Sequence, residues 1–170
     1  AAADITRDGT LVISMDGRKE QITYADEKEI SGALVRLANP EKRNVYFLTG
    51  HGEYPLEGTE TEKFGLAKTE LEAKNYTIHS LNLLIEPSIP DDALAIVIAG
   101  GKSALSKEEV KLLKEFLERG KAIVWLVNPT AESGIKVEDD HFSDYLSEEW
   151  GILVDDDLMI DTNVNPPTIL

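Results

Sequence analysis

The stretch that decides the fold is Val45-Tyr46-Phe47-Leu48-Thr49-Gly50-His51-Gly52-Glu53. It opens on an apolar, β-branched run that predicts a strand, and the glycines that follow end that strand. The segment from Phe64 to Lys74 then carries Leu66, Ala67 and Leu71 at helical spacing. A strand, a glycine-containing loop and a helix in this order indicate an α/β unit.

The same alternation continues toward the C-terminus. Residues 77–83 alternate as a strand does, and residues 93–99 are apolar throughout, which is typical of a strand covered on both faces. Ser106 and Glu109 form a capping box that predicts a helix over 106–119, with Gly120 in the position of its C-terminal cap. This part of the chain predicts two further strands and a helix.

The last part of the pattern predicts another buried strand at 122–127, a helix through 142–150, and further strand at 152–154 and 158–160. Helices of this length between strands are the connections that a parallel sheet requires. The sequence therefore predicts a doubly wound, mostly parallel α/β fold of the flavodoxin-like type.

The N-terminal part is predicted to be a separate hairpin and helix. Residues 10–15 and 19–24 are strand-like runs joined by Asp16-Gly17, which favours a tight turn. A helix should begin after Asp26 and end before Asn39-Pro40. We expect residues 1–43 to lead into an α/β domain over 44–170.

Composition and charge exclude several classes of function. The chain has 170 residues, 42% of them hydrophobic, and no cysteine, which excludes disulfides, cysteine-bound zinc and thiol nucleophiles. Its net charge of -15 disfavours nucleic acid as a partner. No long apolar run and no signal-peptide pattern is present, so we expect no direct membrane insertion by this segment.

The charge is uneven along the chain, and its two ends are abrupt. Residues 131–170 hold Lys136 against eleven acidic residues, which makes an acidic C-terminal part. The start at Ala1-Ala2-Ala3 and the end at residues 166–170 predict that the chain is an excerpt of a longer protein.

Three loops are expected to form a ligand crevice. In an open parallel sheet, ligands bind beyond the carboxyl ends of the strands, where the strand order reverses. If the order of the four strands is 2-1-3-4, the loops after the first and third strands are neighbours, and the loop after the fourth makes a third side. The candidate ligand-binding residues are Gly50, His51, Gly52, Glu53, Gly100, Gly101, Lys102 and Asn128.

Two interpretations of these loops stay open. His51 and Glu53 are a suitable pair for proton transfer, and glycines allow the backbone to approach a ligand closely. Alternatively, the glycines only form turns and His51 bonds the adjoining loop. Binding is favoured over turnover, and we assign no catalytic residue.

The nucleotide and serine-hydrolase motifs are incomplete. A P-loop ending at Lys102-Ser103 requires glycine where Ile96 stands, and a dinucleotide fingerprint requires glycine where Pro55 stands. A nucleophile elbow around Ser103 lacks its closing glycine, because Leu105 is there. We therefore expect no cofactor.

The clustered acids are interpreted as a surface for a partner. They do not follow the calcium-loop pattern, and consecutive acids on a strand point to opposite faces. His79 and His141 lack a second ligand at metal spacing, so we expect structural roles for them and no metal site. The candidate partner-binding residues are Glu138, Asp139, Asp140, Asp155, Asp156 and Asp157.

Several of these segments together resemble a known family, the extracytoplasmic domain of ABC-transporter auxiliary proteins of the gliding-motility GldG type. The strand followed by G-H-G-E is its most specific element. The other segments that carry the resemblance are Leu66 to Tyr76, Ile89-Pro90-Asp91-Asp92, Ile96 to Gly100, Leu105-Ser106, Gly120 and Asn128-Pro129.

The resemblance implies a membrane-anchored parent that works beside an ABC-2-type permease and a separate ATPase. It also implies a fold like that of the class I glutamine amidotransferases, generally without a catalytic role. Those enzymes use a cysteine after a central strand, whereas this chain has Gly100, Gly101, Lys102 and Ser103 there.

The resulting hypothesis is a non-catalytic extracytoplasmic domain that binds a ligand or a partner in an ABC-type transport system. One alternative is a hydrolase or lyase acting on a small, carbohydrate-like substrate, with His51 as general base and Glu53 orienting it. Another is a structural assembly module that docks on the permease through its acidic surface.

Overall fold

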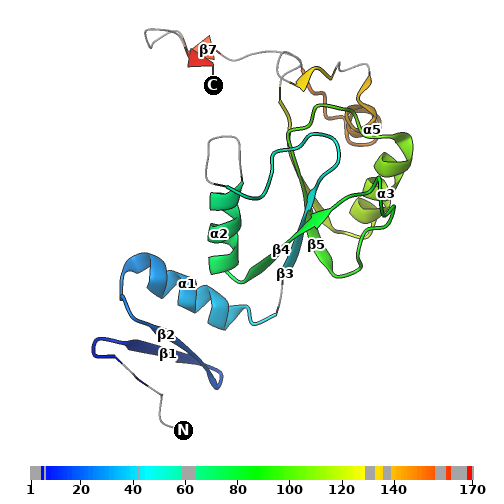
Figure 1. Ribbon diagram of the computed structural model, residues 1–170. Helices are drawn as coiled ribbons and strands as arrows, with labels where there is room; N and C mark the ends of the chain where they lie inside the picture. The colour runs from blue at the N-terminus through cyan, green and yellow to red at the C-terminus, as the bar shows by residue number, and fades with distance from the viewer. Residues whose placement is uncertain are drawn as a thin grey trace.

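A four-stranded parallel sheet is the centre of the molecule (Figure 1). The computed structural model describes residues 5, 7–41, 43–58, 64–128, 133–135, 139–155, 160–161 and 168–169. The strand order is β4-β3-β5-β6. This order confirms the predicted flavodoxin-like α/β fold, and it is the 2-1-3-4 order under which the crevice loops become neighbours. The strands are β3 (Arg43–Leu48), β4 (Tyr76–Leu81), β5 (Ala93–Ala99) and β6 (Ala122–Leu126).

Helices cover both faces of this sheet. Helix α2 (Gly65–Ala73) connects β3 to β4, and α3 (Lys107–Glu118) connects β5 to β6. Because these two crossovers leave the centre of the sheet in opposite directions, a common right-handed sense places them on opposite faces, as Figure 1 shows. Helix α5 (His141–Trp150) lies on the α3 side and contacts α3.

The central strands contribute alternate side chains to two cores. One core, on the α3 and α5 side, is the larger, and the other lies on the α2 side. The first contains Tyr46, Leu48, Ile96, Ile98, Leu113, Phe116 and Phe142, and the second contains Val45, Phe47, Val97 and Ala99, with Phe64 and Leu71 packed against them. Burial on both faces explains why the residues of β3 and β5 do not alternate between polar and apolar.

Strand β6 differs from the prediction that it is buried. It is an edge strand, and Val124 and Leu126 are 46% and 44% exposed. Ile123 and Trp125 pack against the larger core on the other face. Helix α2 packs at the other edge of the sheet, where it contacts β4. Among the described residues, no helix therefore covers the face of β6 that carries Val124 and Leu126. An apolar run alone does not distinguish an edge strand from a central one.

The N-terminal hairpin and helix are confirmed. Strands β1 (Leu11–Met15) and β2 (Arg18–Ile22) pair antiparallel through Asp16 and Gly17, which both have positive φ angles, 49° and 80°. Helix α1 (Glu27–Ala38) is capped at its N-terminus by Asp26, whose side chain accepts a hydrogen bond from the Glu29 amide at 2.8 Å. Arg36 of α1 donates to the carbonyl of Ala73 in α2 at 2.8 Å, which ties this unit to the α/β domain.

The C-terminal part confirms one prediction and corrects another. Helix α5 is present, but residues 152–154 form no strand. Gly151 ends α5 in a left-handed conformation with φ 68°, and Ile152 and Leu153 are then 49% and 76% exposed without a strand partner. β7 (Ile160–Asp161) pairs with β8 (Thr168–Ile169), and residues 158 and 159 lie outside the described residues.

Candidate functional site

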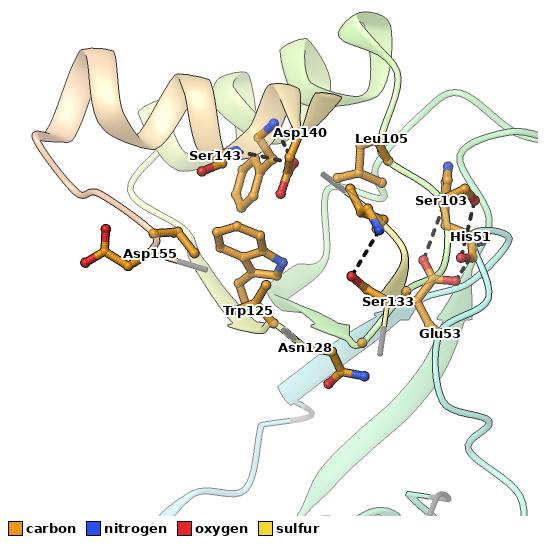
Figure 2. A pocket seen from close by; sticks show the side chains of 17 residues that line it. His51, Glu53, Ser103, Leu105, Trp125, Asn128, Ser133, Asp140, Ser143 and Asp155 are labelled. Atoms are coloured by element: carbon orange, nitrogen blue, oxygen red, sulfur yellow. Dashed lines mark hydrogen bonds and ion pairs between the residues drawn. The ribbon is translucent and has the colours of Figure 1, made fainter. Parts of the chain in front are cut away.

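A cavity of about 170 Å³ lies at the carboxyl ends of β3, β5 and β6 (Figure 2). It is at the position where the strand order reverses, which is the usual ligand site of this fold class. The lining comes from the three strand-end loops, residues 133 and 135, the start of α5 and the chain that follows α5. The side chains that line it include His51, Glu53, Ser103, Ala104, Trp125, Asn128, Ser133, Asp140, Phe142, Ser143 and Asp155.

Backbone contacts join the three loops. Glu53 and Gly100 form an isolated antiparallel bridge, and the Lys102 amide donates to the His51 carbonyl at 2.7 Å. The Asn128 side chain donates to the Tyr54 hydroxyl at 2.8 Å, which adds the loop after β6. Gly100 has φ 75°, and a β-carbon there would lie 2.9 Å from the Tyr54 ring. Both the backbone conformation and the close approach therefore require glycine at this position.

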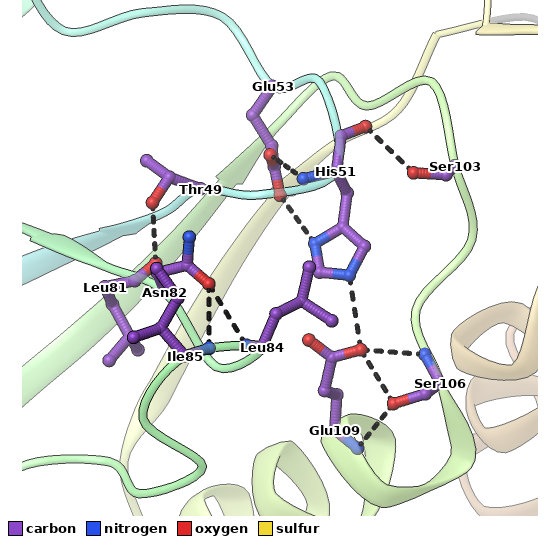
Figure 3. Close-up of polar contacts among 10 residues, drawn as sticks. All are labelled: Thr49, His51, Glu53, Leu81, Asn82, Leu84, Ile85, Ser103, Ser106 and Glu109. Carbon is purple, nitrogen blue, oxygen red and sulfur yellow. Dashed lines mark hydrogen bonds and ion pairs between the residues drawn. The ribbon is translucent and has the colours of Figure 1, made fainter.

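His51 is held between two buried carboxylates (Figure 3). Its Nδ1 lies 3.3 Å from Glu53 Oε1, and its Nε2 lies 3.2 Å from Glu109 Oε2. The His51 side chain is 6% exposed, and those of Glu53 and Glu109 are 2% and 5% exposed. Both ring nitrogens therefore face carboxylates of the protein itself, and neither is directed at a substrate.

Glu109 is the residue of this cluster that sequence reasoning missed. The sequence identified it only as half of a capping box, and that box is present at the start of α3. The same Oε2 atom accepts from the Ser106 amide at 2.9 Å and the Ser106 hydroxyl at 2.7 Å. Its Oε1 is buried without a hydrogen-bond partner among the described residues. The available signal was the position of this helix start, directly after a predicted crevice loop.

Asp140 lies at the other end of the cavity, as the N-cap of α5. Its Oδ1 accepts from the amides of Phe142 and Ser143 at 3.1 and 3.4 Å. Figure 2 shows the second carboxylate oxygen directed toward the interior of the cavity. Burial raises the pKa of Asp140, and the two amide hydrogen bonds only partly oppose this shift. The surrounding groups therefore only partly stabilise the negative charge of this carboxylate.

Two aromatic side chains form the wall beside Asp140. Trp125 of β6 and Phe142 of α5 meet edge to face, with ring centroids 5.1 Å apart and an interplanar angle of 79°. Figure 2 shows the indole nitrogen of Trp125 turned toward the interior. This nitrogen makes no hydrogen bond within the part of the chain that the structure describes. An indole N–H is only a donor, so the wall offers a free donor to the cavity.

The cavity brings together some of the predicted site residues but not all. His51, Glu53, Gly100, Gly101 and Asn128 line it, together with Asp140 and Asp155 from the predicted partner surface. Three of the predicted ligand-binding residues, Gly50, Gly52 and Lys102, do not line it.

The remaining predicted site residues lie elsewhere. Gly50 lies against the side chain of Asn82, and the exposed Lys102 packs its stem over Gly52. Asp139 is exposed next to the cavity, and Glu138, Asp156 and Asp157 lie outside the described residues. Within the described ranges, no group of three or more acidic or histidine side chains is placed to hold a metal ion.

Comparison with known proteins identifies a family. Residues 42–170 match the model of a family described as an ABC-type uncharacterized transport system. The match covers more than half of the chain, so the chain belongs to this family of transport-system auxiliary components. No curated protein and no solved structure matches the chain. No helix in the described ranges is long and apolar enough to span a membrane.

Proposed function

We propose that this chain is a non-catalytic, extracytoplasmic binding domain of an ABC-2-like transport system and that the cavity at the strand ends is its ligand site. Family membership supports the role in transport. The binding role is supported by the position of the cavity, at the reversal of strand order where ligands of this fold class bind. The proposal extends to a membrane-anchored parent that works with a permease and a separate ATPase.

The observation that carries the non-catalytic part is the environment of His51. A general base needs a free nitrogen within hydrogen-bond reach of the proton that it removes. Both ring nitrogens of His51 instead contact carboxylates that are themselves buried. The His51 contacts join the loop after β3 to the start of α3, which is an architectural role.

Two of the serine hydroxyls that line the cavity, those of Ser103 and Ser133, also lack a catalytic arrangement. Nucleophilic serine requires its hydroxyl to be hydrogen-bonded to a base. The Ser103 hydroxyl instead contacts the backbone carbonyl of His51 at 3.4 Å, and the Ser133 hydroxyl accepts from the Ile135 amide at 3.1 Å. These contacts favour binding over a hydrolase or lyase reaction.

A ligand screen tests the proposal. The 170-residue chain is heated with sugars, amino acids, peptides and nucleotides, and each compound that raises its melting temperature is then checked for chemical change. A ligand at a hundredfold excess over Kd stabilises the native state by about 2.7 kcal/mol. For a chain of this size that corresponds to a rise of roughly 5 to 10 °C.

Ala104→Leu and Ala38→Leu provide the matched variants. Ala104 lines the cavity, so a leucine there fills the space of the ligand, whereas Ala38 is exposed at the end of α1. We expect a compound that stabilises the wild type and Ala38→Leu but not Ala104→Leu, and that is recovered unchanged. Consumption of the compound would establish an enzyme instead. If no compound stabilises the chain while it still captures the permease from membranes, the assembly function replaces the binding function.

A further inference from the structure

The charged groups of the cavity disfavour an anionic ligand. Among the residues that line it, Glu53, Asp140 and Asp155 are acidic and none is lysine or arginine. The buried imidazole of His51 already contacts two carboxylates, so it is not available to an anionic ligand. A phosphate or carboxylate group entering this space would meet negative charge without a cationic partner.

Asp140 provides a specific place for a positive charge. One of its carboxylate oxygens is used to cap α5, and the other is directed into the cavity without a hydrogen bond to any described residue. Burial raises the pKa of Asp140 because it penalises the charged carboxylate. A cation beside this oxygen would offset that penalty.

Trp125, in contrast to Asp140, needs a hydrogen-bond acceptor from the ligand. Its indole N–H is directed into the cavity and lacks an acceptor in the described part of the chain. Ser103 and Ser143 add hydroxyl groups, which donate and accept hydrogen bonds. A ligand that satisfies the wall therefore carries oxygen acceptors as well as a positive charge.

We propose that the cavity binds a small hydroxylated organic cation, with its ammonium group at the inward oxygen of Asp140 and its hydroxyl groups at Trp125 and the cavity serines. This inference rests on the proposed function, because it names the ligand class of the same site. A metal cation fits less well, since hard metal ions take six or more oxygen ligands, and the described ranges hold no group of three or more acidic or histidine side chains placed for a metal. A neutral sugar would leave the Asp140 charge uncompensated.

Three compounds of the same size and ring form separate these possibilities. D-glucosamine, D-glucose and D-glucuronate present a cation, a neutral hydroxyl and an anion on one scaffold, and their affinities are measured by calorimetry near neutral pH. Hydrogen bonds to charged groups contribute more than neutral ones, so we expect glucosamine to bind roughly tenfold or more tightly than glucose. Glucuronate should show no binding.

Asp140→Asn tests the assigned contact without removing the helix cap. Asparagine caps helices about as well as aspartate, so the variant should fold while it loses the charge. We expect glucosamine affinity to fall roughly tenfold and glucose affinity to stay within about twofold. Asp139→Asn removes the same charge from the exposed neighbouring residue and should change neither affinity.

The outcomes distinguish this inference from the proposed function. Equal affinity for glucosamine and glucose, or full glucosamine binding by Asp140→Asn, would overturn the ligand class while the cavity remained a binding site. If none of the three sugars binds, the ligand class is also overturned. The wider screen with Ala104→Leu then decides separately whether the cavity binds anything.

Discussion

The two ends of the cavity use their polar groups in opposite ways. At the histidine end, formed by His51, Glu53 and Glu109, each ring nitrogen faces a carboxylate and the backbone of His51 is also bonded. At the α5 end, formed by Asp140, Trp125 and Phe142, a carboxylate oxygen and an indole N–H point into the cavity without partners among the described residues. Paired polar groups hold a structure together, whereas unpaired ones at a cavity are available to a ligand.

This comparison predicts that substitutions at the histidine end reduce stability and that substitutions at the α5 end reduce binding. The distinction matters for experiments, because a loss of binding in an unfolded variant identifies no site. Each variant is therefore measured for its free energy of unfolding in urea, and for ligand affinity where it is folded.

His51→Ala should have the largest effect. It leaves the carboxylates of Glu53 and Glu109 buried without their common partner, and removing one member of a buried ion pair costs about 3 to 5 kcal/mol. Urea unfolding measures this loss. His141→Ala is the control, because His141 is partly exposed and its ring lies 3.7 Å from the Asp144 carboxylate. This control should reduce the free energy of unfolding by less than about 1 kcal/mol. A loss below about 1 kcal/mol in His51→Ala would show that the buried cluster does not hold the loops.

Gly100→Ala should have the next largest effect, about 2 to 3 kcal/mol. The alanine would adopt φ 75° and place its β-carbon 2.9 Å from the Tyr54 ring. Gly120→Ala is matched to it, because Gly120 also has φ 75° but nothing lies within 4 Å of the added carbon. That control should cost about 1 kcal/mol, so the difference in urea unfolding isolates the contact with Tyr54. Equal losses would mean that the ring moves aside freely.

Trp125→Phe should change binding more than stability. The substitution keeps an aromatic side chain against Phe142 but removes the N–H that faces the cavity. We expect a stability change under about 1 kcal/mol and roughly fivefold weaker glucosamine binding. Trp150→Phe is the control, because the Trp150 N–H donates to the Tyr145 hydroxyl at 2.9 Å and not to the cavity. Unchanged affinity in Trp125→Phe would remove the indole from the proposed site.

The sequence predicted the sheet well because its signals are local. Continuous apolar runs identified β3 and β5, and the complete capping box of Ser106 located the start of α3. The exposure of β6 was missed because a strand's place in the sheet depends on which segments cover it, and an apolar run does not contain that information. Residues 152–154 have strand-like side chains but no neighbouring strand with which to pair.

The candidate site was predicted only in part, for the same reason. His51 and Glu53 are separated by a single residue in the sequence, so their pairing was visible there. Glu109 lies 58 residues from His51, and its contact exists only once α3 is packed beside the loop after β3. Asp140 was interpreted as one of several surface acids because burial cannot be read from a run of charges. Long-range contacts of this kind need the fold.

The smallest predicted effect is the dependence of stability on pH through Asp140. The folded chain holds the Asp140 proton more tightly than the unfolded chain, because burial raises its pKa above the ordinary value of 3.8. The folded state therefore binds more protons between the ordinary and the raised pKa, and stability falls as pH rises through that window. Below the window the carboxyl is protonated in both states and this penalty disappears. Solvent screening of a partly exposed group keeps the effect to roughly a few tenths of a kcal/mol.

Asp140→Asn removes this penalty, so its stability relative to wild type should rise with pH across the window and then become constant. Urea unfolding at several pH values measures the difference, with Asp139→Asn as the control for the change in net charge. A bound ammonium group favours the charged carboxylate, so glucosamine binding should strengthen as pH rises through the same window. Binding that weakens over this range would mean that the ligand prefers the protonated carboxyl. The ligand group beside Asp140 would then be a hydrogen-bond acceptor and not a cation. The α5 end would therefore not differ from the histidine end by offering a place for a positive charge.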